Sequence, residues 1–320
     1  MRFATFTHDG RQQAGVLVDD ALHPLAPGRT VLDLVRGGLP DALREGADAV
    51  GSAAPLPLSQ VRLLAPLQPP TVRDFVAFEE HVEGVRASID GADGPPAAWY
   101  DAPTFYFTNP YAVVGTGDDV AVPPGSQQLD FELEVAAVIG TAGHDLTDRE
   151  AHDAVFGYCI MNDWSARDLQ RREMQVNLGP AKGKDSATTL GPWLVTADEV
   201  ADAHDADGFL RLAMTVRVNG VEIGRDLLSN MGWPFAELVA YASVGTWVRP
   251  GDVLGSGTCG NGGCLAELWG RRGATDPPPL QPGDVVQMKV ERLGTITNAV
   301  VAGLPAPQVL PARTRPRDRP

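Results

Sequence analysis

Three carboxylates alternate with apolar residues in the segment QQLDFELEVAAVIG, residues 127–140. Successive side chains of a β-strand point to opposite faces, so Asp130, Glu132 and Glu134 share one face and the apolar residues between them share the other. Carboxylates this close repel one another, and burying them is costly unless a cation compensates. This face of the predicted strand therefore lies in water or carries a positive group.

The composition is that of a globular protein with a substantial core. Of 320 residues, 43% are hydrophobic and 21% are charged, and the formal net charge is −15, which argues against a nucleic-acid partner. The N-terminus turns polar after a few residues and no apolar run is long enough to span a bilayer. We therefore expect no signal peptide and no membrane partner, and predict a soluble, cytoplasmic protein.

The three cysteines, Cys159, Cys259 and Cys264, are too few for a disulfide framework in a chain of this length. Cys259 and Cys264 also lack a nearby histidine with which to complete a zinc site. We predict that all three are reduced thiols and that Cys159 lies in the core.

The strand and helix signals predict a mostly β protein with short helices, of the α+β class. A hairpin over residues 1–20 and a composition shift rich in Gly, Ala and Pro indicate a small β-rich N-terminal domain, residues 1–65. A larger domain is predicted over residues 66–310. The basic, proline-rich end, residues 311–320, is predicted to be disordered.

Helix signals are fewer and shorter than the strand signals. The segment TVRDFVAFEEHVEGVRAS has helical spacing, and residues 84–103 after it have the composition of a mobile loop. Thr147 and Glu150 form a capping box at the start of one short helix, and Ser165 is placed to cap another.

Several oxygen ligands for a hard divalent cation are placed where they can converge. Glu132 and Glu134 lie on one strand face, and Asp163 ends another strand-like run, YCIMND, immediately before a helix. A solvated strand face explains the two glutamates about equally well. The apolar residues that follow them make full solvation less favourable.

Hydrogen-bond donors follow Asp163 in the sequence. Arg167 and Gln170 are three residues apart and share one helix face, and Lys184 lies in a glycine-bearing loop. Such donors suit an oxyanion or a substrate carboxylate. Each of them alone is more often an ordinary surface residue.

Five segments of the chain together resemble those of a known family. The segments LDFELEVAAVIG, MNDWSARDLQ, LGPAKGKDSATTLGPW and GSGT, with VRDFVAFEEHV upstream, closely resemble signature stretches of the fumarylacetoacetate hydrolase family, in the same order. The resemblance spans roughly residues 70–305. It implies a fumarylacetoacetate hydrolase-type β-sandwich roll, a homodimer, and one divalent cation, with Mg²⁺ favoured and Mn²⁺ or Ca²⁺ as alternatives.

The resemblance also implies roles for individual residues. Metal ligands are implied at Glu132, Glu134 and Asp163, with Asp74 as a further ligand found in some members. A general base that activates water is implied at His81. Substrate binding and stabilisation of developing negative charge are implied at Arg167, Gln170 and Lys184, a substrate contact at Thr258, and an acid that orients the histidine at Glu267.

The match has two departures from the family pattern. Val76 stands where several members carry a tyrosine that touches the substrate, which leaves the polarity of the substrate there open. Some shorter relatives place a glutamate three residues after the histidine, where this chain has Gly84. We therefore favour Glu267 as the partner of His81. Asp130 is either a neighbour of the site or an exposed residue at the strand start, and we expect it to be exposed.

The predicted function is a metal-dependent hydrolase that cleaves a C–C bond in a 1,3-dicarbonyl acid of the fumarylacetoacetate, fumarylpyruvate or acylpyruvate type, through an enolate held by the metal. A 2-oxo acid decarboxylase and a 2-hydroxy-dienoate isomerase are the alternatives on the same site. A non-catalytic metal-binding dimer is the alternative outside enzymes. A base with a carboxylate partner favours hydrolysis, since water must be activated.

Overall fold

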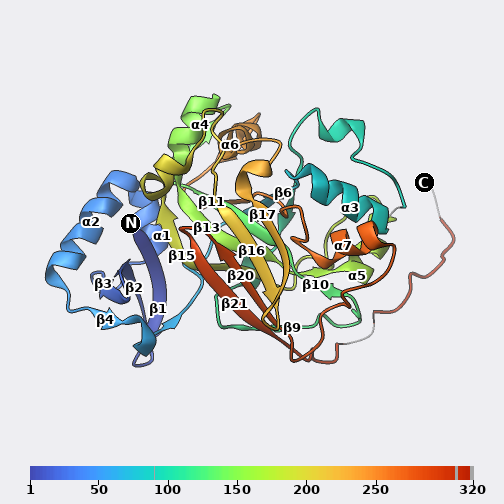
Figure 1. Cartoon of the computed structure of the whole chain (residues 1–320), viewed down its shortest axis with the longest axis horizontal. Helices are drawn as coiled ribbons and strands as arrows, with labels where there is room; N and C mark the ends of the chain where they lie inside the picture. Colours follow the sequence, from blue (N-terminus) through green and yellow to red (C-terminus); the bar gives the residue numbers. More distant parts are fainter. Residues whose placement is uncertain (90, 307–308, 318–320) are drawn as a thin grey trace.

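The computed structural model describes residues 1–89, 91–306 and 309–317. A twelve-stranded sheet extends across the molecule and a five-stranded sheet packs against its centre (Figure 1). Short helices cover the ends and edges of the two sheets. The predicted class, mostly β with short helices, is confirmed.

The larger sheet has the strand order β4-β3-β2-β1-β15-β13-β11-β19-β6-β7, with β5 beside β1 and β8 beside β15. Its strands are β1 (Arg2–His8), β2 (Arg11–Val18), β3 (Ala21–Pro24), β4 (Leu56–Pro57), β5 (Arg62–Leu63), β6 (Val72–Phe75), β7 (Phe105–Thr108), β8 (Val113–Val114), β11 (Leu133–Ile139), β13 (Val155–Asp163), β15 (Thr188–Thr196) and β19 (Val253–Gly255).

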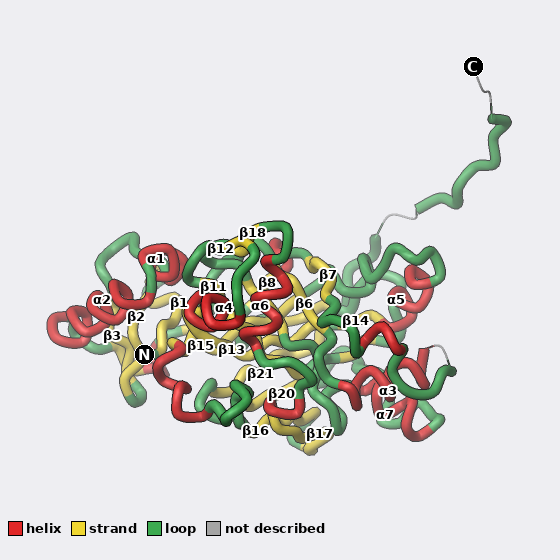
Figure 2. Tube along the Cα trace, turned by 90° about the horizontal axis from the view of Figure 1, so that it is seen from above, coloured by secondary structure: helices red, strands yellow, loops and turns green. Residues whose placement is uncertain are grey.

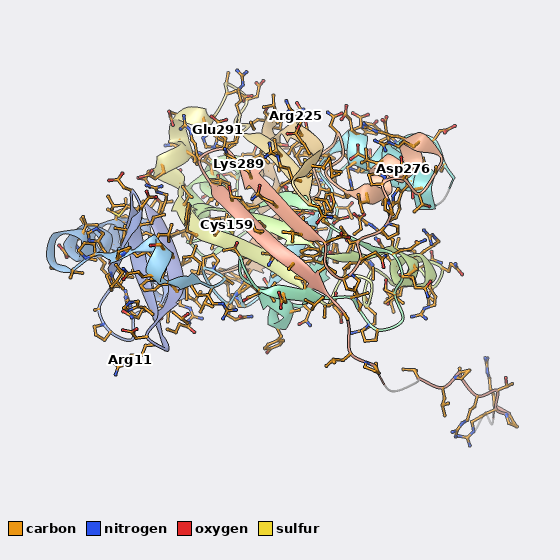
Figure 3. The ribbon with its side chains drawn as sticks, turned by 60° about the horizontal axis from the view of Figure 1, so that its bottom comes forward. Arg11, Cys159, Arg225, Asp276, Lys289 and Glu291 are labelled. Carbon is orange, nitrogen blue, oxygen red and sulfur yellow. The ribbon has the colours of Figure 1, made fainter. Side chains whose placement is uncertain are left out.

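The five-stranded sheet has the order β17-β16-β20-β21-β9, and two further strand pairs lie outside both sheets. The bounds are β9 (Asp119–Ala121), β16 (Ala213–Val218), β17 (Val221–Leu227), β20 (Val285–Val290) and β21 (Gly294–Val301), with the pairs β10 (Leu129–Asp130) and β14 (Ser165–Ala166), and β12 (Gly143–His144) and β18 (Trp247–Val248). Arg225, Lys289 and Glu291, which Figure 3 labels, are among the residues that line a cavity on this sheet.

Strand β11 is buried on both faces, which explains its continuous apolar run. Val135 and Ala137 face the core between the two sheets, where Val216 and Met288 of the smaller sheet also lie. Ala136 and its neighbours on the opposite face belong to a second core, which the N-terminal helices cover. Burial of both faces fixes the register of this strand, and with it the direction of the glutamates at its start.

The N-terminal segment continues the large sheet instead of forming a sheet of its own. The predicted hairpin is present as β1 and β2, and β1 pairs with β15 of the main body. Two helices, α1 (Val31–Gly37) and α2 (Leu39–Ser52), pack beside these strands (Figure 1). Helix α2 was not predicted, because its Gly- and Ala-rich composition hides its helical spacing. The predicted boundary at residues 65–66 stays a prediction.

Three helices, α3 (Glu79–Ile89), α5 (Arg167–Met174) and α7 (Leu265–Arg272), gather at the end of the molecule opposite α1 and α2 (Figure 2). The remaining α-helices, α4 (Asp148–Ala154) and α6 (Phe235–Ser243), pack against each other. The capping box of Thr147 and Glu150 at the start of α4 is confirmed. None of the helices in the described ranges is both long and apolar enough to cross a membrane.

Some local predictions were wrong. The helical spacing expected from residue 71 does not hold at its start, since Val72–Phe75 is strand β6 and the helix begins at Glu79. Ser165 does not cap α5, because it lies in β14 and donates its hydroxyl to the Asp163 carbonyl.

Two further predicted segments are described in part. The predicted loop over 84–103 contains the rest of α3 and a 3₁₀ turn at Ala97–Trp99, and residue 90 lies outside the described residues. Of the tail, residues 311–317 are exposed without helix or strand, and 318–320 lie outside the described residues. The disorder of the tail stays a prediction.

Helices α3 and α7 approach so closely that their contact requires glycine. A Cβ atom added at Gly270 would lie 1.9 Å from the carbonyl oxygen of Gly84, and one added at Gly84 would lie 2.5 Å from Cγ of Glu267. The contact at Gly270 is to a backbone atom, so a side-chain rotation cannot relieve it. The absence of side chains at Gly84 and Gly270 therefore sets the distance between α3, which carries His81, and α7.

We expect Gly270→Ala to lower the free energy of unfolding by about 1–3 kcal/mol or more, because the methyl group overpacks the α3–α7 contact. Gly51→Ala is the matched control: Gly51 is also helical, and an added Cβ there meets no atom within 4 Å. The control should be neutral or stabilising by up to about 1 kcal/mol. Urea unfolding measures both variants, and equal effects would contradict this account of the contact.

Candidate active site

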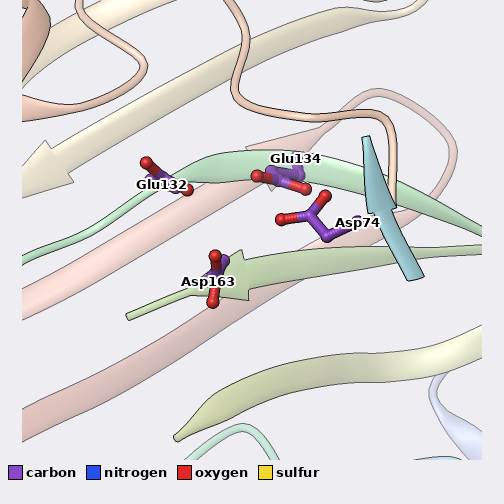
Figure 4. Close-up of side chains that lie close together, drawn as sticks. All are labelled: Asp74, Glu132, Glu134 and Asp163. Carbon is purple, nitrogen blue, oxygen red and sulfur yellow. The ribbon is translucent and has the colours of Figure 1, made fainter. Parts of the chain in front are cut away.

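Four buried carboxylates from neighbouring strands converge on one point (Figure 4). Asp74 lies on β6, Glu134 on β11 and Asp163 at the end of β13, while Glu132 immediately precedes β11. Each side chain offers an oxygen within 4.8 Å of those of the other three, and each residue is at most 3% exposed. The structure thus brings together all four of the metal ligands that the resemblance implied.

A glycine makes the space in which these carboxylates meet. Strand β19 lies between β11 and β6, and its Gly255 pairs with Ala136 on one side and Asp74 on the other. A Cβ atom there would lie 2.5 Å from Asp74 Oδ1 and 2.9 Å from Glu134 Oε2. This role was not predicted, although Gly255 is the first residue of the GSGT segment.

The carboxylate cluster has the properties of a cation site. Asp74 Oδ1, Glu134 Oε2 and Asp163 Oδ1 are buried without a hydrogen-bond partner. Burial and the repulsion of neighbouring carboxylates raise the pKa values of Asp74 and Glu134 well above their ordinary range. A hard divalent cation prefers several oxygen ligands and removes this repulsion. The residues present therefore fit one such ion.

Two buried cations flank the cluster. Lys184 Nζ donates to Glu132 Oε2 at 2.5 Å and to Asp163 Oδ2 at 2.7 Å, and Arg167 Nη2 donates to Glu132 Oε1 at 2.7 Å. Burial acts to raise the pKa of Glu132, but the positive charges of Lys184 and Arg167 hold it below its ordinary value. Glu132 is therefore ionised and held in place from both sides.

Asp130 is fully buried, so the expectation that it is exposed was wrong. Its Oδ2 accepts from Arg167 Nε at 2.8 Å. Its two oxygens also accept the backbone N–H groups of Leu265 (2.8 Å) and Ala266 (3.0 Å), in the first turn of α7. Asp130 thus joins the start of α7 to Arg167 and, through Arg167, to Glu132.

A pocket of about 360 Å³ opens beside the carboxylate cluster. It is lined by predicted site residues from both the metal-ligand set and the substrate-binding set, and by an apolar wall. The predicted residues are Asp74, His81, Glu132, Arg167, Gln170, Lys184 and Thr258, and the wall includes Phe75, Val76, Val85, Phe105, Met174 and Pro180.

His81 lies in the wall of this pocket, on α3, and is 6% exposed. Burial lowers the pKa of His81 to about 3, so its imidazole is neutral at physiological pH. The hydrogen-bond partner that the described residues offer it is the thiol of Cys264, whose Sγ lies 3.7 Å from Nδ1. All three cysteines are free and Cys159 is buried, as predicted, and Cys259 and Cys264 are buried as well.

The Glu267 carboxylate has partners other than His81. The Glu267 carboxylate accepts the N–H of Gly262 at 3.3 Å and pairs with Arg271 at 2.9 Å. Burial raises the pKa of Glu267 to about 7, partly offset by Arg271. Its role as the partner of His81 stays a prediction.

Tyr106 is a site residue that sequence analysis missed. It lies on β7 directly opposite Asp74, lines the pocket, and donates its hydroxyl to Asp163 Oδ2. The signal was weak, since Tyr106 is one of several aromatic residues in the strand segment TFYFTN. Its importance depends on the pairing of β7 with β6, which the sequence does not reveal.

Comparison with known proteins agrees with the geometry. The family model described as fumarylacetoacetate (FAA) hydrolase C-terminal matches residues 71–301, most of the chain. The chain belongs to the fumarylacetoacetate hydrolase family. A second model, described as Rv2993c-like, N-terminal, matches residues 1–66. Members of this family include hydrolases, isomerases and oxaloacetate tautomerases.

Three relatives illustrate the similarity. Oxaloacetate tautomerase YisK from Bacillus subtilis (strain 168) is 29% identical, over 94% of this chain and 100% of its own. The structure of fumarylacetoacetate hydrolase from psychrophilic Exiguobacterium antarcticum is 29% identical, with a TM-score of 0.74, and 94% of this chain and 99% of that chain are covered. Maleylpyruvate hydrolase from Sphingobium sp. SYK-6, solved with manganese (II) ion and pyruvate, shares the fold, at 23% identity, a TM-score of 0.70 and coverage of 95% and 100%.

We expect a divalent cation to stabilise the chain, because it binds the folded carboxylate cluster and not the unfolded chain. Mg²⁺ or Mn²⁺ at about 100 times its Kd should raise the free energy of unfolding by about 2.7 kcal/mol, and chelation should reverse this. Glu134→Gln should remove most of the effect.

The matched control is Glu83→Gln, since Glu83 is an exposed carboxylate on the same helix as His81. This variant should respond to the cation like the parent chain. Denaturation with and without the cation measures all three proteins. An undiminished response in Glu134→Gln would place the cation elsewhere.

Proposed function

We propose that this chain is a divalent-metal-dependent hydrolase that cleaves a C–C bond in a 1,3-dicarbonyl acid of the acylpyruvate type. One observation carries the proposal: a buried four-carboxylate cluster opens into a pocket that also contains a neutral histidine and an apolar wall. The cluster suits the two oxygens of an oxo acid through a cation, the histidine suits water activation, and the wall suits an acyl group.

The cation would be held by Asp74, Glu132, Glu134 and Asp163. When bound, it supplies Lewis-acid polarisation of a carbonyl group and neutralises developing negative charge. An all-oxygen ligand set suits a hard cation such as Mg²⁺ or Ca²⁺, and Mg²⁺ is the ion proposed. Mn²⁺ is an alternative, supported by the manganese in the maleylpyruvate hydrolase structure.

The proposed base is His81. A neutral imidazole can take a proton from a water molecule in the pocket and later return it to the product. Because burial lowers the pKa of His81 to about 3, acid conditions do not remove this lone pair until far below neutral pH.

The proposed substrate-binding donors have N–H groups to spare. Lys184 donates to two carboxylates, which leaves one N–H of its ammonium for a substrate oxygen. Gln170 accepts from Arg167 through Oε1 at 3.1 Å, so its amide nitrogen can donate to the substrate. These groups would stabilise negative charge that develops during cleavage, while the main contribution of Arg167 is to hold Glu132 and Gln170.

The lining of the pocket favours a substrate whose acyl group is uncharged. Two cations line the pocket, Arg167 and Lys184, and both are paired with carboxylates. The other residues that line it, which include Val76 and Val85, carry no positive charge. A second substrate carboxylate would be desolvated there without a partner, which is costly. An acylpyruvate with a neutral acyl group therefore fits better than a fumaryl substrate.

Oxaloacetate tautomerisation is the second candidate. It is supported by the full-length similarity to an oxaloacetate tautomerase and by the pairing of the Glu267 carboxylate with Gly262 and Arg271 instead of His81. Moving a proton between carbon and oxygen needs a base but no activated water. Decarboxylation of a 2-oxo acid remains an alternative for the same site, and a homodimer in the cytoplasm remains part of the proposal.

We expect acetylpyruvate to be cleaved in the presence of Mg²⁺, with a kcat/KM at least about tenfold above that of fumarylpyruvate, because burying the extra carboxylate is unfavourable. His81→Gln should lower kcat by about 10²–10⁴-fold with little change in KM. His152→Gln, an exposed histidine on α4, is the control and should keep full activity. The loss of the 1,3-dicarbonyl absorbance measures cleavage.

Oxaloacetate is assayed in parallel for enol–keto conversion and for release of carbon dioxide. Conversion of oxaloacetate without cleavage of any 1,3-dicarbonyl acid would replace the hydrolase proposal with the tautomerase. Release of carbon dioxide alone would indicate a decarboxylase. Cleavage that persists in His81→Gln would contradict the role of the histidine but would leave the proposed reaction intact.

A further inference from the structure

We propose that Cys264 is the positioning residue of His81: its sulfur accepts the Nδ1–H of the imidazole and so leaves the Nε2 lone pair free to take a proton in the pocket. This inference rests on the proposed role of His81. It deepens that role, because it names a partner for the histidine that is not a carboxylate.

The first argument is the geometry of the pair. Cys264 Sγ lies 3.7 Å from His81 Nδ1, which is within hydrogen-bond distance for sulfur, and Cys264 is fully buried. A neutral imidazole carries its proton on one ring nitrogen, and the partner of the other nitrogen decides which. If Nε2 is to act as the base, the proton belongs on Nδ1, and Cys264 is the acceptor that the described residues offer there.

The second argument is that the carboxylate expected to orient His81 has other partners. The Glu267 carboxylate accepts the N–H of Gly262 and pairs with Arg271. On α7, Glu267 lies about one helical turn after Cys264. Gly84 occupies the position on α3 at which a glutamate could reach back to the histidine. A side chain at Gly84 would collide with Glu267 Cγ at 2.5 Å, so the α3–α7 contact excludes that arrangement.

The third argument is the chemistry of the helix cap. Cys264 is the N-cap of α7, and its Sγ accepts the N–H of Glu267 at 3.4 Å. Serine, threonine, aspartate and asparagine are much better N-caps than a thiol. A cysteine at this position is therefore poorly explained by capping alone, and its sulfur contacts the imidazole as well as the helix N–H.

The fourth argument is that the position of Cys264 is fixed relative to the carboxylate cluster. The next two residues, Leu265 and Ala266, donate their N–H groups to Asp130, which is paired with Arg167. Arg167 in turn holds Glu132. Burial also raises the pKa of the Cys264 thiol well above its ordinary value, so it stays a neutral acceptor rather than becoming a thiolate.

The test compares Cys264→Ala and Cys264→Ser with the control Cys259→Ala in the Mg²⁺-loaded full chain. Cys259 is equally buried and lies at the other end of the same loop, and among the described residues the thiol that contacts the His81 ring is that of Cys264. With acetylpyruvate, Cys264→Ala should lower kcat by at least about tenfold at unchanged KM. Cys264→Ser, which keeps an acceptor and a helix cap, should recover most of the activity, and Cys259→Ala should behave as the parent chain.

The decisive readout is the tautomer of His81, observed by long-range ¹H–¹⁵N NMR of the ring and assigned with His81→Gln. The parent chain should show a protonated Nδ1 and an unprotonated Nε2, and Cys264→Ala should shift the ring toward the other tautomer or a mixture. A parent chain with the proton on Nε2, or a tautomer unchanged in Cys264→Ala, would overturn the inference.

The two proposals fail in distinguishable ways. If the parent chain cleaves no 1,3-dicarbonyl acid, the proposed function fails, but the NMR result still decides whether Cys264 sets the tautomer. If Cys264→Ala does not fold, Cys264→Ser still tests the inference, because its hydroxyl must preserve the Nδ1-protonated form. A serine variant that folds but carries the opposite tautomer would overturn it.

Discussion

The site depends on one buried guanidinium. Arg167 is 1% exposed and donates to Asp130, Glu132 and Gln170 at once, so it joins the start of α7, a metal-ligand candidate and a substrate-binding candidate. Removing one partner of such a buried pair leaves an uncompensated charge and costs about 3–5 kcal/mol. The three carboxylates of the segment LDFELEVAAVIG are thus accounted for: Arg167 balances Asp130 and Glu132, and Glu134 belongs to the candidate cation site.

The fold determines where this network can form. Burial of β11 on both faces fixes its register, and the order β13-β11-β19-β6 then brings Asp163, Glu134 and Asp74 together around the space left by Gly255. At the same end of the molecule, the close contact of α3 with α7 sets His81 beside Cys264. The rigid sheet thus supplies the charged part of the site, and two packed helices supply the proposed base with its partner.

Much of the site could be predicted from the sequence, because period-two spacing and a strand end are local features. Glu132, Glu134 and Asp163 follow from such features, and Asp74, His81, Lys184 and Thr258 follow from the resemblance. Residues whose role depends on tertiary pairing could not be predicted: Tyr106 requires the pairing of β7 with β6, Gly255 requires the order of three strands, and Asp130 requires the approach of α7. The burial of Asp130 was missed because no local pattern shows that an arginine and a helix start will cover it.

The central claim is that Asp74, Glu132, Glu134 and Asp163 hold one divalent cation at the floor of the pocket that His81 faces. The most direct measurement is a crystal structure of the Mn²⁺-soaked protein with anomalous scattering recorded near the manganese edge. The account predicts one strong anomalous peak per chain, ligated by these carboxylates at about 2.0–2.2 Å, and no peak in Glu134→Gln. A peak at another site, or none in protein that still turns over its substrate, would contradict it.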